Sequence, residues 1–319
     1  MKKNIFNLII IIILFCILIS LFIFSNDIFI TCSFAFSIWK ENIFPALFPM
    51  FIISDLLINY GFIDLLGEIT KRIMNKLFCL PGESSFVIIA SMFSGFPSSA
   101  KYIYELLDTK LITKENAEYL LTFTHFSNPL FVIGTIGGLL KSKKLALIIL
   151  LVHILTNFII AFVIKKKREI NTSKICIKNA LYKIEEKRKN NSFIKVLTTS
   201  ITKTINTLLL LLGIITTFLI LSKIINNLVH FSPINQAIIS GILEMTQGIK
   251  YVSLLDISAN LKSALITFFI SFGGISIHLQ IKSILSNTNV NYKNYLFARI
   301  IHASLSSIIV FIITSIIKI

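Results

Sequence analysis

Glu244 stands inside an otherwise apolar stretch and is the side chain with the clearest capacity for chemistry in this sequence. It lies in the run GILEMTQG, where Thr246 and Gln247 add groups that can hydrogen-bond a ligand. An ionised group inside a membrane is costly, so it marks a functional site by default. Glu244 could bind a coupling proton or sodium ion. The alternative is a structural ion pair with Lys101 or Arg299.

A second polar group surrounds a pair of helix-breaking residues. The run reads, in order, Ser94, Gly95, Phe96, Pro97, Ser98, Ser99, Ala100 and Lys101. Pro lacks an N–H and Gly tolerates unusual backbone angles, so a helix is interrupted here. We expect a half-helix to begin near Ser98, with Ser98 or Ser99 as its cap and Lys101 adding positive charge to a ligand site. The alternative is a kinked packing helix with a face of small residues.

Two further segments combine break-prone dipeptides with polar side chains, in the runs HFSNP and SFGGISIHLQ. Unwound stretches of this kind expose backbone groups to a bound solute. The candidates for ligand contact in them are Asn128, Gly273, Gly274 and Gln280. We expect His125 and His278 to be hydrogen-bonded structural residues rather than ligands.

Pro45 and Pro49 strain the start of another apolar run, and Asp55 follows them. Two placements of Asp55 remain open from the sequence. It faces a cavity, or it lies near the aqueous end of its helix.

The elements that carry these motifs are long apolar runs. The chain has 319 residues, is 55% hydrophobic and only 14% charged, against about 25% charged in soluble domains. A helix needs about 20 apolar residues to cross a bilayer, and backbone groups in lipid must pair internally. We therefore predict an all-α, polytopic transmembrane bundle. Its runs cover residues 5–24, 44–60, 84–100, 117–140, 144–164, 196–222, 232–249, 262–285 and 294–317.

The halves of the chain resemble each other. Ser94-Gly95 corresponds to Ser240-Gly241, and Thr122-Phe123 to Thr267-Phe268. Inverted repeats with broken helices are a recurring plan of secondary transporters. The predicted divisions are an N-terminal transmembrane helix (1–27), a first repeat (40–164), a basic cytoplasmic linker (165–192) and a second, inverted repeat (193–319).

Charge favours hairpins that return to the side from which they started. If 84–100 crossed the membrane completely, the basic linker would lie outside, against the positive-inside tendency. We therefore predict re-entrant hairpins at 84–100 and 232–249. We interpret the charges of the linker as a solvated loop with no binding role. Residues 61–80 are interpreted as a helix in the membrane interface or as a cytoplasmic loop helix.

Several classes of function find no support in the sequence. The net charge of +16 lies mostly between apolar runs, and no module with interleaved basic and aromatic residues predicts nucleic-acid binding. The four cysteines form no CxxC pair or Cys/His cluster, so no metal site is expected. No signature of an enzyme occurs. The expected partners are the lipid bilayer and a small anionic or polar solute, with no cofactor beyond a coupling ion.

Six motifs in order carry a resemblance to a known family. They read IFPALFPMFIISDLLINYG, LPGESSF, FSGFPSSAK, FTHFSNPLFVIGTIG, GILEMTQG and SFGGISIHLQ, from about residue 40 to residue 300. They are similar to motifs of the YlbJ-type sporulation integral membrane proteins, also called stage V sporulation protein VV, which carry a nucleoside-recognition (Gate) domain. The sequence departs from many relatives in FPSSAK, where a Gly is expected between the Ser positions.

The resemblance implies a multi-pass protein of the cell membrane, placed in the outer forespore membrane of a sporulating bacterium. It implies transport of dipicolinic acid, a planar aromatic dianion, by alternating access. It also implies paired hairpins like those of concentrative nucleoside transporters, so a nucleoside-type solute remains an alternative. A membrane scaffold that recruits partners through the basic linker is the other interpretation.

Overall fold

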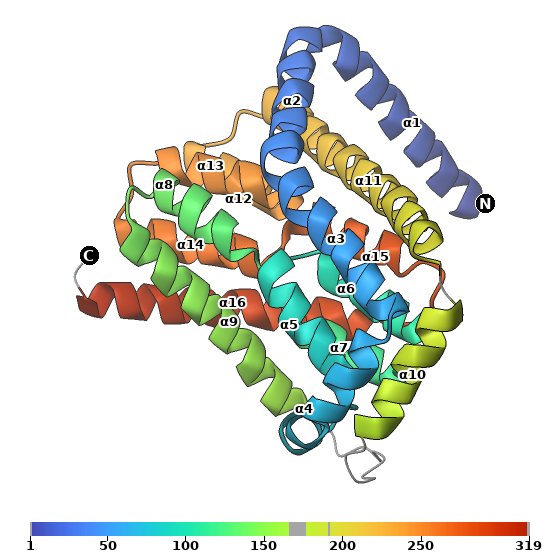
Figure 1. Ribbon diagram of the computed structural model, residues 1–319. Coiled ribbons are helices and arrows are strands. Elements are labelled where there is room, and N and C mark those ends of the chain that lie inside the picture. Colours follow the sequence, from blue (N-terminus) through green and yellow to red (C-terminus); the bar gives the residue numbers. More distant parts are fainter. Residues whose placement is uncertain (1, 166–176, 191, 318–319) are drawn as a thin grey trace.

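The computed structural model describes residues 2–165, 177–190 and 192–317, and all regular structure in these residues is helical (Figure 1). Six helices in this part are long and apolar enough to cross a membrane. They cover Ile5–Ile23, Ser25–Asn59, Lys143–Ile164, Phe193–Leu228, Ala259–Ile284 and Tyr292–Ile317. The predicted class, a membrane protein built from helices, is therefore confirmed.

The first half of the chain begins with two long helices. They are α1 (Lys2–Ile23) and a continuous rod made of α2 (Ser25–Ile38), the π-helical turn η1 (Trp39–Ile43) and α3 (Phe44–Asn59). The remaining elements are α4 (Phe62–Phe78), α5 (Ser84–Ser94), α6 (Ser98–Asp108), α7 (Lys114–Phe123), η2 (Phe131–Ile136), α8 (Gly137–Leu139) and α9 (Lys143–Ile164). The sequence analysis placed no helix over 25–43, where polar residues interrupt the apolar pattern.

The second half shows part of the same order. It contains α10 (Ile177–Asn190), α11 (Phe193–Leu228), α12 (Pro233–Leu243), α13 (Met245–Leu254), α14 (Ala259–Phe272), α15 (Gly274–Ile284) and α16 (Tyr292–Ile317). The two short arms, the broken helix and the final span begin at residues 84, 98, 114 and 143 in the first half, and at 233, 245, 259 and 292 in the second. The order of elements supports an internal repeat. The inverted orientation of its halves stays a prediction.

Both predicted hairpins reverse the direction of the chain. Phe86 on α5 packs edge-on against Tyr102 on α6, with ring centroids 5.4 Å apart, whereas a straight helix would separate these residues by about 24 Å. In the second half, a Cβ added to Gly248 would lie 2.1 Å from Gly241 Cα, so the backbones of α12 and α13 are in contact. Whether the hairpins re-enter the membrane on one side stays a prediction.

The equivalence proposed for the hairpin residues needs correction. Gly95 directly follows the first arm of its hairpin, and Glu244 holds the same place in the second. Ser240-Gly241 lie one turn earlier, inside α12. The similarity of Ser94-Gly95 to Ser240-Gly241 therefore misaligns the two hairpins by about one turn.

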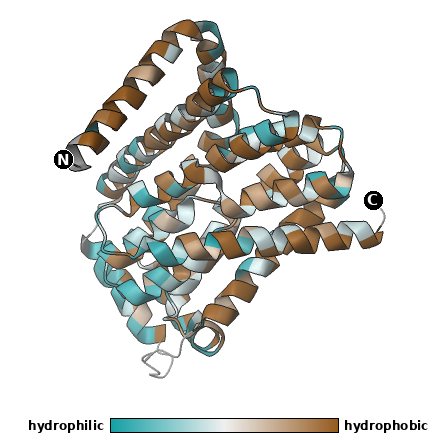
Figure 2. Ribbon diagram, turned by 180° about the vertical axis from the view of Figure 1, so that it is seen from behind, coloured by the Kyte–Doolittle hydropathy of each residue, from teal (hydrophilic) through white to brown (hydrophobic). Residues whose placement is uncertain are grey.

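The linker is more than a solvated loop. Its residues 166–176 and 191 lie outside the described residues, but α10 packs against α4. Lys187 and Lys183 reach the buried carboxylate of Asp64 at 2.6 and 3.3 Å. The interpretation that the linker charges have no binding role is wrong for α10, because Lys183 and Lys187 form salt bridges with Asp64 of α4. Hydrophilic residues gather at this end of the molecule, and apolar residues dominate the long helices (Figure 2).

Candidate functional site

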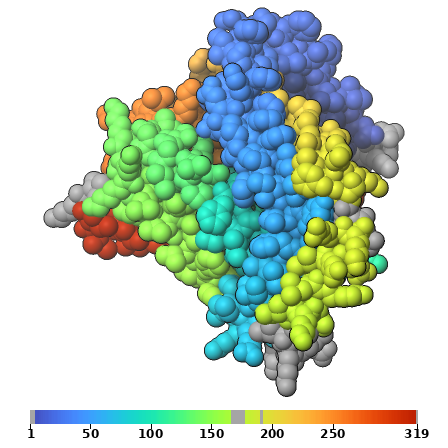
Figure 3. All heavy atoms as spheres, in the orientation of Figure 1, coloured from blue at the N-terminus to red at the C-terminus, as the bar shows by residue number. Residues whose placement is uncertain are grey.

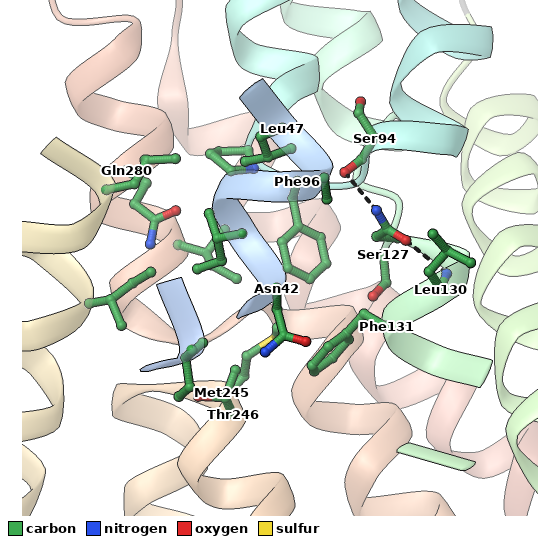
Figure 4. A pocket seen from close by; sticks show the side chains of 18 of the residues that line it. Asn42, Leu47, Ser94, Phe96, Ser127, Leu130, Phe131, Met245, Thr246 and Gln280 are labelled. Atoms are coloured by element: carbon green, nitrogen blue, oxygen red, sulfur yellow. Dashed lines mark hydrogen bonds between the residues drawn. The ribbon is translucent and has the colours of Figure 1, made fainter. Parts of the chain in front are cut away.

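A cavity of about 300 Å³ lies where the two halves meet. Its walls come from the rod around η1, from both hairpin turns, from the unwound chain after α7, from α11 and from α15. In the space-filling view the rod of α2 and α3 runs across the face of the molecule, beside part of α11 (Figure 3). In the close-up, Asn42, Phe96, Phe131, Thr246 and Gln280 surround the same space (Figure 4).

The cavity has a buried polar floor and an exposed mouth. Its floor contains the buried side chains of Ser94, Ser127, Glu244 and Gln280. Its mouth is formed by exposed residues that include Glu41, Asn42 and Leu130. Two carboxylates, Glu41 and Glu244, line the cavity, and no Lys, Arg or His is among its lining residues. Among the described lining residues the ionisable groups are therefore carboxylates, and they are set in a wall that is mostly apolar.

Glu244 occupies the turn between α12 and α13. Its extended backbone ends α12, and its side chain caps α13 by accepting from the Thr246 and Gln247 amides at 2.9 and 3.1 Å. The Thr246 hydroxyl also donates to it. All these bonds fall on Oε2. Because Glu244 lines the cavity, Oε1 is the oxygen that can receive a ligand proton donor or a cation.

The break in the first hairpin joins the unwound chain after α7. Gly95 has a positive φ of 78°, and a Cβ there would lie 2.6 Å from the Asn128 backbone nitrogen, so only glycine fits. The Phe96 amide donates to the Phe126 carbonyl at 2.7 Å. The Asn128 side chain donates to the Ser94 carbonyl at 3.4 Å and accepts from the Leu130 amide at 2.8 Å. These bonds hold Ser94 and Asn128 at the cavity wall.

A buried network supports this unwound segment from behind. The Ser127 amide donates to His153 Nε2 at 3.0 Å, so the neutral ring carries its proton on Nδ1, 3.0 Å from the Ser271 hydroxyl. The Asn157 side chain donates to the His125 carbonyl at 2.8 Å. Ser271 lies beside the break at Gly273, where a Cβ would come within 3.0 Å of the His125 ring. Both broken helices are thus fixed to each other.

The predicted site residues divide into three groups. Those that line the cavity are Ser94, Pro97, Asn128, Glu244, Thr246 and Gln280. Those that form its supporting turns are Gly95, Ser98, Gly273 and Gly274. Those placed elsewhere are Ser99, Lys101 and Gln247; Ser99 is buried in α6, and Gln247 donates to the Tyr251 hydroxyl at 2.8 Å beside a different pocket.

The geometry corrects three statements of the sequence analysis. Lys101 does not line the cavity, because its ammonium pairs with Asp55 at 2.8 Å and with Glu105 at 3.4 Å. Neither Ser98 nor Ser99 caps α6, which begins after Pro97; the Ser98 hydroxyl instead donates to the Gly95 carbonyl. The suggested pairing of Glu244 with Lys101 or Arg299 does not occur either, since the Glu244 carboxylate caps its own helix.

The histidines behave as expected of structural residues. His125 is fully buried, stacks on Phe96 and shares a hydrogen bond with Tyr295. His278 bonds the Phe272 carbonyl at 3.0 Å and the Tyr292 hydroxyl. Neither ring lines the cavity.

Glu41, Asn42, Phe96 and Phe131 also line the cavity, although the sequence analysis did not select them. The signal for Glu41 and Asn42 was the polar run Lys40-Glu41-Asn42 in the middle of an apolar helix. η1 places this run at the mouth, and π-helical turns occur frequently at functional sites.

Comparisons with known proteins address the same segments. Residues 41–166 match the family model for nucleoside recognition, called Gate. This is the resemblance that the sequence motifs predict. The matched segment begins within η1 and includes the first hairpin and the unwound chain after α7, which together form much of the cavity wall.

The chain is also similar to the sporulation integral membrane protein YlbJ of Bacillus subtilis (strain 168). The two are 28% identical over 310 residues, which cover 87% of this chain and 75% of the relative. No solved structure matches the chain.

Proposed function

We propose that this protein carries a small planar polar solute across the membrane of a sporulating cell by alternating access. The cavity at the meeting point of both hairpin turns supports this proposal most directly, because broken helices in transporters serve to hold a solute, and here their turns bring a few polar groups into a mostly apolar cavity. The match to the Gate family model and the similarity to a sporulation membrane protein also support this proposal.

The lining favours a solute that donates hydrogen bonds. The amides of Asn42, Asn128 and Gln280 could bind the edge of a heterocycle, and Phe96 and Phe131 offer aromatic surfaces. The Glu244 carboxylate could accept from hydroxyl groups. These features favour a nucleoside-type solute.

Dipicolinate, the solute implied by the family resemblance, fits the shape of a planar ring but not the charge of the cavity. Its two negative charges would meet Glu41 and Glu244 without a lining cation. Its transport therefore requires a proton or a metal cation that enters together with it and offsets the carboxylates.

Uptake into proteoliposomes tests the proposal. Radiolabelled uridine and dipicolinate are compared with and without imposed proton and sodium gradients, using wild-type protein, Glu244→Gln and the surface control Glu185→Gln. We expect saturable uptake of one solute, reduced about tenfold or more in Glu244→Gln because a buried hydrogen-bonded charge contributes about 1.5–3 kcal/mol to ligand contact. Uptake equal to that of empty vesicles for both solutes under every gradient would contradict transport of these classes.

A further inference from the structure

A second pocket of about 270 Å³ is lined, like the central cavity, by residues of α3 and α11. It is lined by residues of α3, α6 and the start of α11, namely Asp55, Ile58, Asn59, Glu105, Asp108, Thr109, Lys195, Val196, Thr199, Ser200 and Lys203. Its outer residues, including Asp108, Lys195 and Lys203, are exposed. Lys195 is in the first turn of α11, which begins directly after the linker helix α10 (Figure 1). The pocket therefore opens at the end of the molecule that carries α10.

The two pockets follow one line along three helices. Leu47 on α3, Pro97 directly before α6 and Leu211 on α11 line the central cavity. The second pocket is lined by Asp55, Glu105 and Lys203, each eight residues along the chain from its counterpart. Eight residues of helix span about 12 Å. A barrier of that thickness separates the two spaces.

The barrier contains a buried ion cluster. Lys101 lies midway between Pro97 and Glu105, with its ammonium 2.8 Å from Asp55 Oδ1 and 3.4 Å from Glu105 Oε1. The same ammonium lies 4.3 Å from the centre of the Phe51 ring, which is fully buried. Lys101 of α6 thus contacts Asp55 and Phe51 of α3, and these contacts block the direct path between the two pockets.

Two polar atoms in this barrier lack the partners that buried groups normally have. Glu105 Oε2 and Thr204 Oγ1 are buried without a hydrogen bond. Thr204 lies on α11, between Leu211 and Ser200. Unsatisfied buried groups carry a free-energy cost and call for an explanation. A second conformation, in which water or solute reaches these atoms, supplies one.

We infer that the second pocket is the vestibule through which solute enters or leaves the central cavity at the linker face. The cluster of Lys101, Asp55, Glu105 and Phe51 is its gate. The inference rests on the proposed transport function and adds the route and the residues that control it. The structure then represents the state in which the gate is closed and the central cavity opens through its mouth at Glu41 and Asn42.

Cysteine labelling in oriented vesicles tests the gate without requiring a known solute. In a background with all native cysteines replaced by serine, Thr199→Cys, at an exposed residue of the second pocket, reports the vestibule. Leu211→Cys reports the central cavity, and Glu185→Cys on α10 identifies the linker face. A membrane-impermeant methanethiosulfonate is added at that face. We expect rapid modification of Thr199→Cys and slow modification of Leu211→Cys.

The gate is then opened by replacing Asp55→Asn, Lys101→Met and Glu105→Gln together, which removes all three charges of the cluster at once. Minor conformations are typically populated at about 0.1–10%, so making the open state dominant accelerates modification of Leu211→Cys about tenfold or more. Asp55→Glu keeps a carboxylate for Lys101 and leaves its pairing with Glu105 in place, and we expect slow modification in this control. Phe51→Ala provides a second opening variant if the neutral cluster folds poorly.

Unchanged slow modification of Leu211→Cys in every opening variant, with Thr199→Cys still accessible, would overturn the gate. An inaccessible Thr199→Cys would overturn the vestibule. Both results are independent of solute uptake. Labelling that follows the expected pattern without uptake of either tested solute would therefore retain the gated route and reject the proposed solutes.

Discussion

Glycine packing at the second hairpin turn sets how closely its arms can approach. A Cβ on Gly248 would lie 2.1 Å from Gly241 Cα, and one on Gly241 would lie 2.4 Å from the Phe269 ring. The two arms and α14 therefore meet at a point with no room for a methyl group. This contact fixes the direction in which Glu244 and Thr246 leave the turn toward the cavity.

Gly248→Ala should destabilise the protein by about 1–3 kcal/mol, the usual cost of forcing extra methylenes into a packed core. Gly213→Ala is the matched control, because nothing lies within 4 Å of its added Cβ and alanine is the better helix former. Thermal unfolding in detergent measures both. A midpoint for Gly248→Ala equal to that of Gly213→Ala would show that the hairpin arms are not packed as described.

Single residues also show what sequence reasoning can reach. The breaks at Gly95–Pro97, His125–Pro129 and Gly273 were predictable, because Gly and Pro act on the backbone locally. The partner of Lys101 was not, because Asp55 lies on another helix and only the folded chain brings the two together. The position of Glu41 at the cavity mouth likewise depends on a π-helical turn that carries no Gly or Pro signal.

Among the helices, α4 and α10 form a contact that joins the first half to the linker. Asp64 near the start of α4 is buried and receives Lys183 and Lys187 from α10. Ile184 lies against Gly61, where an added Cβ would come within 3.0 Å of it. The periodic apolar face of 61–80 predicted the helix, but its covering partner could not be recognised from charges that are also typical of solvated loops.

Asp64→Asn should loosen α10, because two lysines lose their carboxylate while their own ends can return to water. The expected loss is about 1 kcal/mol, since the lysines are partly exposed. Limited trypsin digestion should then cut faster after Lys183 and Lys187. Glu185→Gln, which alters an exposed pair on the same helix, should cut at the wild-type rate. Equal rates for both variants would contradict a stabilising contact.

Arg299 of α16 is fully buried and connects the two halves of the molecule. Its guanidinium donates to the Thr122 carbonyl, to Asn157 Oδ1 at 3.2 Å and to His302 Nδ1 at 2.7 Å. In the described part of the chain no carboxylate lies within ion-pair distance of it. One forked side chain therefore connects α16 to α7 and α9.

Arg299→Lys should destabilise the protein by about 3 kcal/mol, because lysine presents a single ammonium and cannot reproduce a planar fork, leaving buried acceptors unpaired. Arg72→Lys on the exposed side of α4 is the matched control. The thermal midpoint in detergent and solute uptake are measured together. A wild-type midpoint in Arg299→Lys would show that the fork does not join the halves.

At this scale the sequence predicted the helical membrane bundle and the resemblance between the halves, because apolar runs and repeated motifs are visible along one dimension. It could not place the network of Arg299, His302, His153 and Ser271, whose members are spread over three helices. In the sequence each of these is a polar residue within an apolar run. Only the folded chain brings them close enough to form hydrogen bonds with one another.

The chain contains one tryptophan, Trp39, in the η1 turn at the edge of the central cavity. Its indole N–H donates to the Leu208 carbonyl of α11 at 2.8 Å, and its ring packs against Phe44. Its neighbours Ile38 and Glu41 line the cavity. The unmodified protein therefore carries its own optical probe: intrinsic fluorescence, excited selectively at the indole, reports the polarity around η1. A titration with unlabelled compounds can rank solutes by emission change before any flux is measured.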